Sequence, residues 1–214
     1  MIKAAIFDLD GVLIDSEKWH HESFNQVLKE FHLQLELKEF KHLFGTGALS
    51  IIRGIFEKNG IAKNPLPYVS KKDEIYRELI KNKIKALPGA GELLQRLKEK
   101  DYKTALASST ALENLELIMK KLGIEKYIDY YISGATLQQT KPNPEIFLRC
   151  ALALKVENEE CLVVEDSKAG IEAAKNAGMK CIAVAFTLPK EDLVKADKAV
   201  NRIGDITLEM IQNV

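Results

Sequence analysis

The chain has 214 residues, and its 31 Lys and Arg residues balance its 31 Asp and Glu residues, so the net charge is near zero. This length allows one large domain, or a domain with a smaller companion, and a substantial buried core. The charge balance lacks the basic excess of nucleic-acid-binding proteins, and no apolar run could span a membrane, so we expect neither partner.

The first predicted strand covers Ile2–Phe7, a short apolar run. Asp8, Asp10 and Gly11 follow it directly. Side chains two residues apart on a strand share a face, so both carboxylates could look into one crevice. Two like charges so close favour a cation or a proton between them. The alternative interpretation is a solvated, Asp-rich turn at the end of a strand.

A helical pattern begins after Asp15, and four helices are predicted before the next strand. Ser16 is a candidate N-cap for the first, in which apolar residues repeat at helical spacing up to Phe31. The other three are expected at Leu35–Phe44, Ala48–Lys58 and Val69–Lys85. We therefore expect residues 16–87 to form a helical bundle, inserted into the remaining chain through two linkers.

From Ala90 onward, predicted strands alternate with predicted helices. The strands are expected at Lys103–Ala107, Tyr130–Ile132, Cys161–Glu165 and Cys181–Ala185. The helices are expected at Ala90–Lys100, Leu112–Leu122, Pro144–Leu154, Ala169–Asn176 and Thr207–Gln212. This alternation predicts an α/β fold with a parallel, doubly wound sheet, formed by residues 1–15 and 88–214. The helical insert would lie beside the carboxyl ends of the strands, where it could act as a lid.

Polar residues follow the predicted strands at the edge where open α/β sheets bind ligands. Beyond Asp8 and Asp10, these residues are Ser108, Ser109, Thr110, Lys141, Glu165 and Asp166. The set suits phosphoryl transfer, because a carboxylate can attack phosphorus and other carboxylates can hold a hard divalent cation. A hydroxyl and a lysine can neutralise phosphate oxygens, and a second carboxylate can move protons.

Each of these residues, taken alone, also has a purely structural interpretation. Lys141 could be a solvated loop lysine, and Ser108 could cap the helix that starts near Ala111. Glu165 and Asp166 could be acids at a helix N-terminus. Their joint presence at the ends of several strands favours a functional site.

Together these residues resemble the four motifs of haloacid dehalogenase superfamily phosphatases, in the β-phosphoglucomutase/phosphoglycolate-phosphatase-like branch with an α-helical cap. Asp8–Val12 resembles the first motif, Ser108 the hydroxyl motif, Lys141-Pro142 the lysine motif and Glu165-Asp166 the acidic motif. The resemblance covers essentially the whole chain. It implies a Rossmann-like core, Mg²⁺ dependence and a phosphoaspartyl intermediate.

The resemblance also implies a role for each motif residue. Asp8 would be the nucleophile, and Asp10 the general acid/base, which would bind metal through its backbone carbonyl. Ser108 and Lys141 would hold the transferring phosphoryl group, and the amide of Ser109 would donate to a phosphate oxygen. The implied magnesium site consists of Asp8, Asp10, Glu165 and Asp166. The haloalkanoic-acid dehalogenases of the superfamily lack the second aspartate, so Asp10 counts against dehalogenation.

In the insert, His20 and Lys72 match positions used in β-phosphoglucomutase, where the histidine helps to position the acid/base aspartate. That mutase has an arginine in its cap loop that grips the second phosphate of its intermediate. The corresponding stretch here, Gly45–Ser50, contains no cation, and the next one is Arg53. Simple hydrolysis is therefore favoured over mutase activity. The candidates for substrate contact in the cap are Thr46, Arg53 and Lys72.

We therefore expect a Mg²⁺-dependent phosphatase that acts on a small phosphorylated metabolite, either a sugar phosphate or a phosphoglycolate-like compound. A β-phosphoglucomutase-type isomerase is the first alternative. A non-catalytic binding module is the second, against which Asp10 counts because a binder needs no acid/base. The three cysteines are far apart in apolar stretches, and no signal peptide is evident. These features predict a cytoplasmic protein, and nothing demands more than a monomer.

Overall fold

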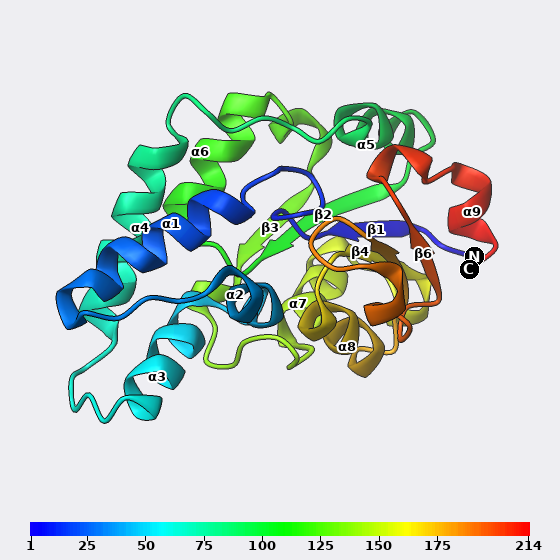
Figure 1. Ribbon diagram of the computed structural model, residues 1–214. Helices are drawn as coiled ribbons and strands as arrows, with labels where there is room; N and C mark the ends of the chain where they lie inside the picture. Colours follow the sequence, from blue (N-terminus) through cyan, green and yellow to red (C-terminus); the bar gives the residue numbers. More distant parts are fainter.

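The computed structural model describes residues 1–214 and shows a parallel sheet covered by helices, with a further group of helices beside one end (Figure 1). The six strands lie in the order β3-β2-β1-β4-β5-β6, and all neighbours are parallel. The strands are β1 (Ala4–Phe7), β2 (Lys103–Ser108), β3 (Tyr130–Ser133), β4 (Cys161–Glu165), β5 (Lys180–Val184) and β6 (Lys198–Val200). This order is that of a Rossmann-like fold, so the predicted fold class is confirmed.

The central strands are buried on both faces, which explains their almost continuous apolar sequences. In β1, Ala5 and Phe7 belong to one core cluster of 26 buried residues. Ala4 and Ile6 belong to a second cluster of 21 buried residues on the opposite face. Five helices complete these two layers: α5 (Ala90–Glu99), α6 (Leu112–Leu122) and α9 (Leu208–Gln212) on the first face, and α7 (Glu145–Leu154) and α8 (Lys168–Asn176) on the second.

The first four helices after β1 form a group of their own at the carboxyl ends of the strands (Figure 1). They are α1 (Glu17–Leu28), α2 (Leu37–Leu43), α3 (Ala48–Lys58) and α4 (Leu66–Ile80). Nine buried residues, including Phe24, Phe40 and Phe56, form their separate apolar cluster. We call residues 16–87 the cap and propose them as a domain.

The two linkers between the cap and the core lie against each other. The amide of Leu87 donates to the carbonyl of Leu13 at 2.8 Å, and Ile14 pairs with Ala86 in an antiparallel bridge. The two passages of the chain between the cap and the core are therefore joined by backbone hydrogen bonds.

Three local predictions differ from the structure. The fourth helix begins at Leu66 and ends at Ile80, because Pro65 and Pro67 occupy its first positions, where proline is tolerated. Strand β6 was not predicted, since three residues give too little pattern. The Ser16 side chain makes no capping bond with α1 and bonds to a carboxylate instead.

Cys150, Cys161 and Cys181 are buried free thiols in the second core cluster. None of the helices has the length and apolar character needed to cross a lipid bilayer.

Candidate active site

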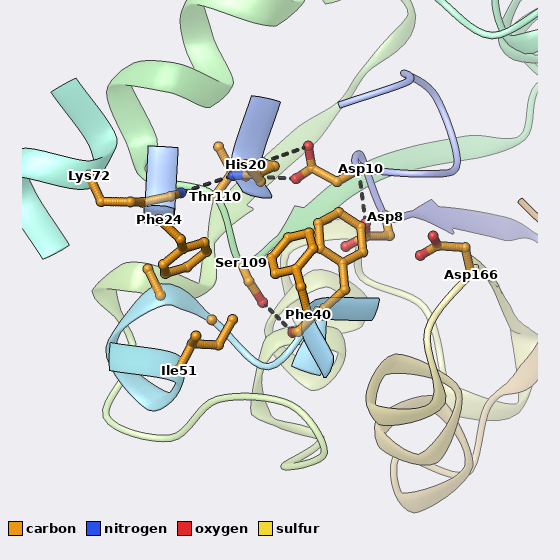
Figure 2. Close-up of a pocket in the computed structure, with 14 residues that line it drawn as sticks. Asp8, Asp10, His20, Phe24, Phe40, Ile51, Lys72, Ser109, Thr110 and Asp166 are labelled. Carbon is orange, nitrogen blue, oxygen red and sulfur yellow. Dashed lines mark hydrogen bonds and ion pairs between the residues drawn. The ribbon is translucent and has the colours of Figure 1, made fainter. Parts of the chain in front are cut away.

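The predicted strand-end residues converge at the carboxyl edge of the sheet, under the cap. Asp8 and Asp10 follow β1, Ser108 ends β2, and Glu165 ends β4. Because β1 lies between β2 and β4, these four side chains come from three adjacent strands. All four are buried. Figure 2 shows Asp8, Asp10 and Asp166 around one pocket.

Lys141 bridges the nucleophile candidate to the acidic motif. Its Nζ atom lies 2.6 Å from Asp8 Oδ1 and 2.6 Å from Glu165 Oε1, and it donates to the carbonyl of Ala107 at 3.3 Å. Burial opposes the lysine charge, but the two carboxylates outweigh it and raise the pKa of Lys141. Burial, with Glu165 and Asp10, raises the pKa of Asp8 to about 7 against the opposing effect of Lys141.

Replacing Lys141 with Met is expected to destabilise the fold, because it leaves Asp8 and Glu165 buried without their cation. The free energy of unfolding should fall by about 3 kcal/mol or more, as measured by urea denaturation. Lys168→Met is the matched control, since Lys168 pairs with Asp192 at 2.8 Å on the surface. Solvent screens an exposed pair of this kind and it contributes little to stability, so equal losses in the two variants would contradict the prediction.

Glu165 and Asp166 occupy different positions despite being neighbours in sequence. Glu165 Oε2 accepts hydrogen bonds from the amides of Asp166 and Ser167 and from the Ser167 hydroxyl. With Lys141 on its other oxygen, Glu165 is fully engaged. The carboxylate of Asp166 lines the pocket and accepts from the Thr187 hydroxyl. Burial, followed by Glu165 and Asp8, raises the pKa of Asp166 well above its ordinary value.

Two glycines allow these carboxylates to sit so close to the backbone. A Cβ atom at Gly170 would lie 1.8 Å from Glu165 Oε1, and one at Gly11 would lie 1.9 Å from Asp166 Oδ2. Gly11 also has a φ of +77°, which side chains disfavour. Both positions therefore require glycine.

The charge balance of this cluster suits a divalent cation. Three buried carboxylates, Asp8, Glu165 and Asp166, face the single charge of Lys141, and burial of unpaired like charges is costly. No group of three or more His, Cys, Asp or Glu side chains is arranged to hold an ion alone. Mg²⁺ commonly takes one or two carboxylates and completes its shell with water and phosphate oxygens, so the residues fit it. The metal roles of Asp8, Asp10, Glu165 and Asp166 stay predictions.

The carboxylate of Asp10 turns away from this cluster toward the cap (Figure 2). It accepts hydrogen bonds from Ser16 Oγ at 2.5 Å, from Thr110 Oγ1 at 2.7 Å and from Ser108 Oγ at 3.3 Å. His20 Nε2 lies 3.1 Å from Asp10 Oδ1. Burial works against ionisation, but His20, Ser16 and Thr110 outweigh it and lower the pKa of Asp10. Asp10 is therefore held as a carboxylate.

The cap fixes the protonation and the orientation of His20. Lys72 Nζ lies 2.9 Å from His20 Nδ1, and an ammonium group can only donate. The Nδ1 atom therefore accepts, and the proton of a neutral ring is on Nε2, which donates to Asp10. Burial and the charge of Lys72 lower the pKa of His20, in agreement with a neutral ring. The Tyr76 ring stacks on the imidazole with centroids 3.8 Å apart.

The cap side of the pocket is mostly apolar. Its lining includes Phe24, Phe40, Phe44, Ala48 and Ile51. Of the substrate residues predicted from the sequence, His20, Lys72 and Ser109 line the pocket, and Ser109 Oγ donates to the carbonyl of Gly45 at 2.9 Å. Thr46 and Arg53 do not line it: the Thr46 hydroxyl donates to the carbonyl of Leu43, and Arg53 is exposed on α3.

Three residues with clear contacts were not predicted as part of the site: Ser16, Tyr76 and Thr187. Thr110 was among the polar residues expected at the strand ends but had no assigned role, and its hydroxyl donates to Asp10. Ser16 was assigned to a helix cap, and nothing in the local sequence of Tyr76 or Thr187 distinguishes them.

The fold and the site together define a class of protein. A buried carboxylate lies beside a lysine, and a second carboxylate is held by a histidine from the inserted helices, at the carboxyl edge of a Rossmann-like sheet. This arrangement suits phosphoryl transfer. The chain belongs to the haloacid dehalogenase-like hydrolase family, whose model matches residues 5–184.

Named relatives agree with this assignment. The beta-phosphoglucomutase of Bacillus subtilis is 31% identical over 218 residues, covering 98% of this chain and 94% of the relative. The fructose-1-phosphate phosphatase YqaB of Escherichia coli is 30% identical over 181 residues, covering 84% of this chain and 94% of the relative. This chain spans 20% of a longer relative, the Arabidopsis thaliana protein SUPPRESSOR OF QUENCHING 1, with 33% identity over 217 residues.

A solved structure, the beta-phosphoglucomutase of Clostridium difficile, matches with a TM-score of 0.90 and 28% identity. The match covers 100% of this chain and 96% of that one, so the cap and the core are both included. The chain is an enzyme of the phosphatase type within this family.

Proposed function

We propose that the protein is a Mg²⁺-dependent phosphatase that hydrolyses a small phosphorylated metabolite through a phosphoaspartyl intermediate. The observation that supports this best is the separation of two neighbouring carboxylates by their contacts. Asp8 pairs with Lys141 at 2.6 Å within the core, whereas Asp10 bonds to His20 of the cap. This separation supports attack by Asp8 and proton transfer by Asp10.

In the first step, an oxygen of Asp8 attacks phosphorus, and the bond between phosphorus and the leaving oxygen breaks. Asp10, carrying the proton that it took from water in the preceding cycle, gives that proton to the leaving oxygen and becomes a carboxylate. In the second step, the Asp10 carboxylate takes a proton from water, whose oxygen attacks the aspartyl phosphate. Asp8 is then regenerated, and inorganic phosphate leaves.

The remaining residues of the site stabilise charge during these steps. Lys141, charged and buried beside Asp8, compensates the negative charge that gathers around phosphorus. The hydroxyls of Ser108 and Thr110 hold Asp10 on the core side, and His20 holds it on the cap side. A Mg²⁺ ion held by Asp8 and Asp166 would supply further positive charge to the phosphate oxygens.

The small pocket between the cap and the core favours small substrates. Its volume of about 40 Å³ holds only a few water molecules, which supports movement of the cap when a substrate enters. Relatives named for phosphorylated carbohydrates and for fructose 1-phosphate support a sugar phosphate as the substrate class, and a phosphoglycolate-like compound is the other candidate. The three buried free thiols support a reducing compartment as the location of the protein, and we propose the cytoplasm. We also propose that the protein is a monomer.

The polar contacts of the cap favour hydrolysis over mutase activity. A mutase has to hold two phosphates, and the one cation of the cap that lines the pocket is Lys72. Its Nζ atom is already bonded to His20 and to Asp73, so no free cation remains for a second phosphate. With β-glucose 1-phosphate we expect free phosphate to appear; glucose 6-phosphate without free phosphate would identify the mutase instead.

Removal of the metal is expected to abolish most of the activity. With p-nitrophenyl phosphate, chelation should lower kcat/KM by at least about tenfold, and added Mg²⁺ should restore it. The reason is that three buried carboxylates would otherwise repel the incoming phosphate with only Lys141 to oppose them. Full turnover in the presence of the chelator would refute the metal dependence.

A further inference from the structure

Asn114 lies on core helix α6, yet both ends of its side-chain amide bond to the cap. Its Oδ1 atom accepts from Arg77 Nε at 2.8 Å, and its Nδ2 atom donates to the backbone carbonyl of Asp73 at 3.2 Å. Arg77 and Asp73 lie one turn apart on α4, which runs beside α6 in Figure 1. The Asn114 side chain is fully buried, although asparagine is a poor helix former and is mostly exposed in proteins.

The orientation of the Asn114 amide follows from its two partners. If the amide were turned around, its NH₂ group would face the Arg77 N–H and its oxygen would face the Asp73 carbonyl. Both contacts would then be repulsive. The two bonds therefore form together, and they require that α4 is seated against α6. None of these three residues lines the substrate pocket.

The same part of α4 leads to the acid/base carboxylate. Lys72 Nζ lies 3.1 Å from Asp73 Oδ1 and 2.9 Å from His20 Nδ1. His20 Nε2 in turn lies 3.1 Å from Asp10 Oδ1. Polar contacts thus run without interruption from core helix α6 through α4 and α1 to Asp10. Because α4 carries both the Asn114 contact and Lys72, the seating of this helix sets the position of His20.

We propose that Asn114 is a positioning residue, which seats α4 in the closed cap and thereby orients Asp10 through Lys72 and His20. This proposal rests on the phosphatase function proposed above. Two hydrogen bonds, one from a charged donor, should shift the equilibrium between the open and the closed cap toward the closed form by roughly 10- to 100-fold. Loss of the contact should therefore impair proton transfer more than it impairs attack by Asp8.

Two substrates separate these effects. An alkyl phosphate such as glycerol 2-phosphate needs a proton on its leaving oxygen, whereas p-nitrophenyl phosphate releases a stabilised anion. In Asn114→Leu, kcat/KM should fall about 10- to 100-fold for the alkyl phosphate and less than about threefold for the aryl phosphate. Asn114→Asp keeps the acceptor for Arg77 but sets its second oxygen against the Asp73 carbonyl, so its loss should also be larger for the alkyl phosphate than for the aryl phosphate. Equal losses on both substrates, or none, would overturn the proposal.

Arg77→Met breaks the same contact at a half-buried residue. This variant tests the proposal even if substitution of the buried Asn114 prevents folding. Glu113→Gln, an exposed change one residue away on α6, is the control and should leave both substrates unaffected. Small-angle scattering of the ligand-free protein gives a readout independent of turnover. Asn114→Leu and Arg77→Met should increase the radius of gyration over wild type and Glu113→Gln. An unchanged radius in both would overturn the seating role even if the protein proved not to be a phosphatase.

Discussion

Turnover is expected to disappear when Asp8 is replaced by Asn, with kcat falling by at least about 10³-fold on any phosphate ester. The amide has the same shape but cannot attack phosphorus. Its oxygen can still accept from Lys141, as Asp8 Oδ1 does at 2.6 Å, so the lysine keeps a partner. Steady-state assays with p-nitrophenyl phosphate and Mg²⁺ measure the loss, and acid-quenched samples should contain no phosphorylated protein.

The loss should not reflect unfolding. The variant gives up the bond between the Asp10 amide and Asp8 Oδ2, but it also removes a buried charge whose pKa is raised to about 7 by burial. These effects oppose each other, so the free energy of unfolding should change by about 1 kcal/mol or less. Asp15→Asn makes the same chemical change at an exposed position of the linker and should keep full activity. Normal turnover by the Asp8 variant would show that the nucleophile is a different group.

The meeting of the strand-end residues was predictable from the sequence, because one rule of sheet geometry governs it. Parallel strands end at the same edge, so Asp8, Ser108 and Glu165 had to meet once their strands were recognised. Their contacts were harder to predict. Lys141 reaches both Asp8 and Glu165 only because β1 and β4 are neighbours, and the order of strands along the chain does not dictate this adjacency.

The contacts of Asp10 depend on how the cap folds back over the sheet. His20 reaches Asp10 from α1 of the cap, and no local pattern encodes that meeting. Thr110, by contrast, reaches Asp10 from the core, in the loop after β2, as the strand-end rule allows. Ser16 shows the same limit: its position before a helix indicated a capping role, but its hydroxyl bonds to Asp10.

The helical pattern of α3 explains why Arg53 does not line the pocket, although its charge suggested a contact with the substrate. The buried face of α3 consists of Ile51, Ile52, Ile55 and Phe56. Arg53 lies between these positions on the opposite side of the helix and is exposed. The pocket is lined instead by Ile51 from the inner face of the same helix.

Replacing Asp10 with Asn is expected to separate the two halves of the reaction. The amide can keep the surrounding hydrogen bonds, because its oxygen can accept from Ser16 and His20 and its NH₂ group can donate to the hydroxyl of Thr110. It can neither give nor take a proton. For an alkyl phosphate, kcat/KM should fall by about 10²- to 10⁴-fold, the usual contribution of general acid–base catalysis.

For p-nitrophenyl phosphate, kcat/KM of the Asp10→Asn enzyme should change by less than about tenfold, because its leaving group needs no acid. Its kcat should still fall, since no base remains to activate water, and phosphorylated protein should accumulate. Acid quenching during turnover measures that accumulation, and the double variant with Asp8→Asn should abolish it. Equal losses of kcat/KM on both substrates, without accumulation, would assign Asp10 to binding rather than to proton transfer. The position of its carboxylate argues for proton transfer, because the side chain faces His20 and the cap, away from the acidic cluster of Asp8, Glu165 and Asp166.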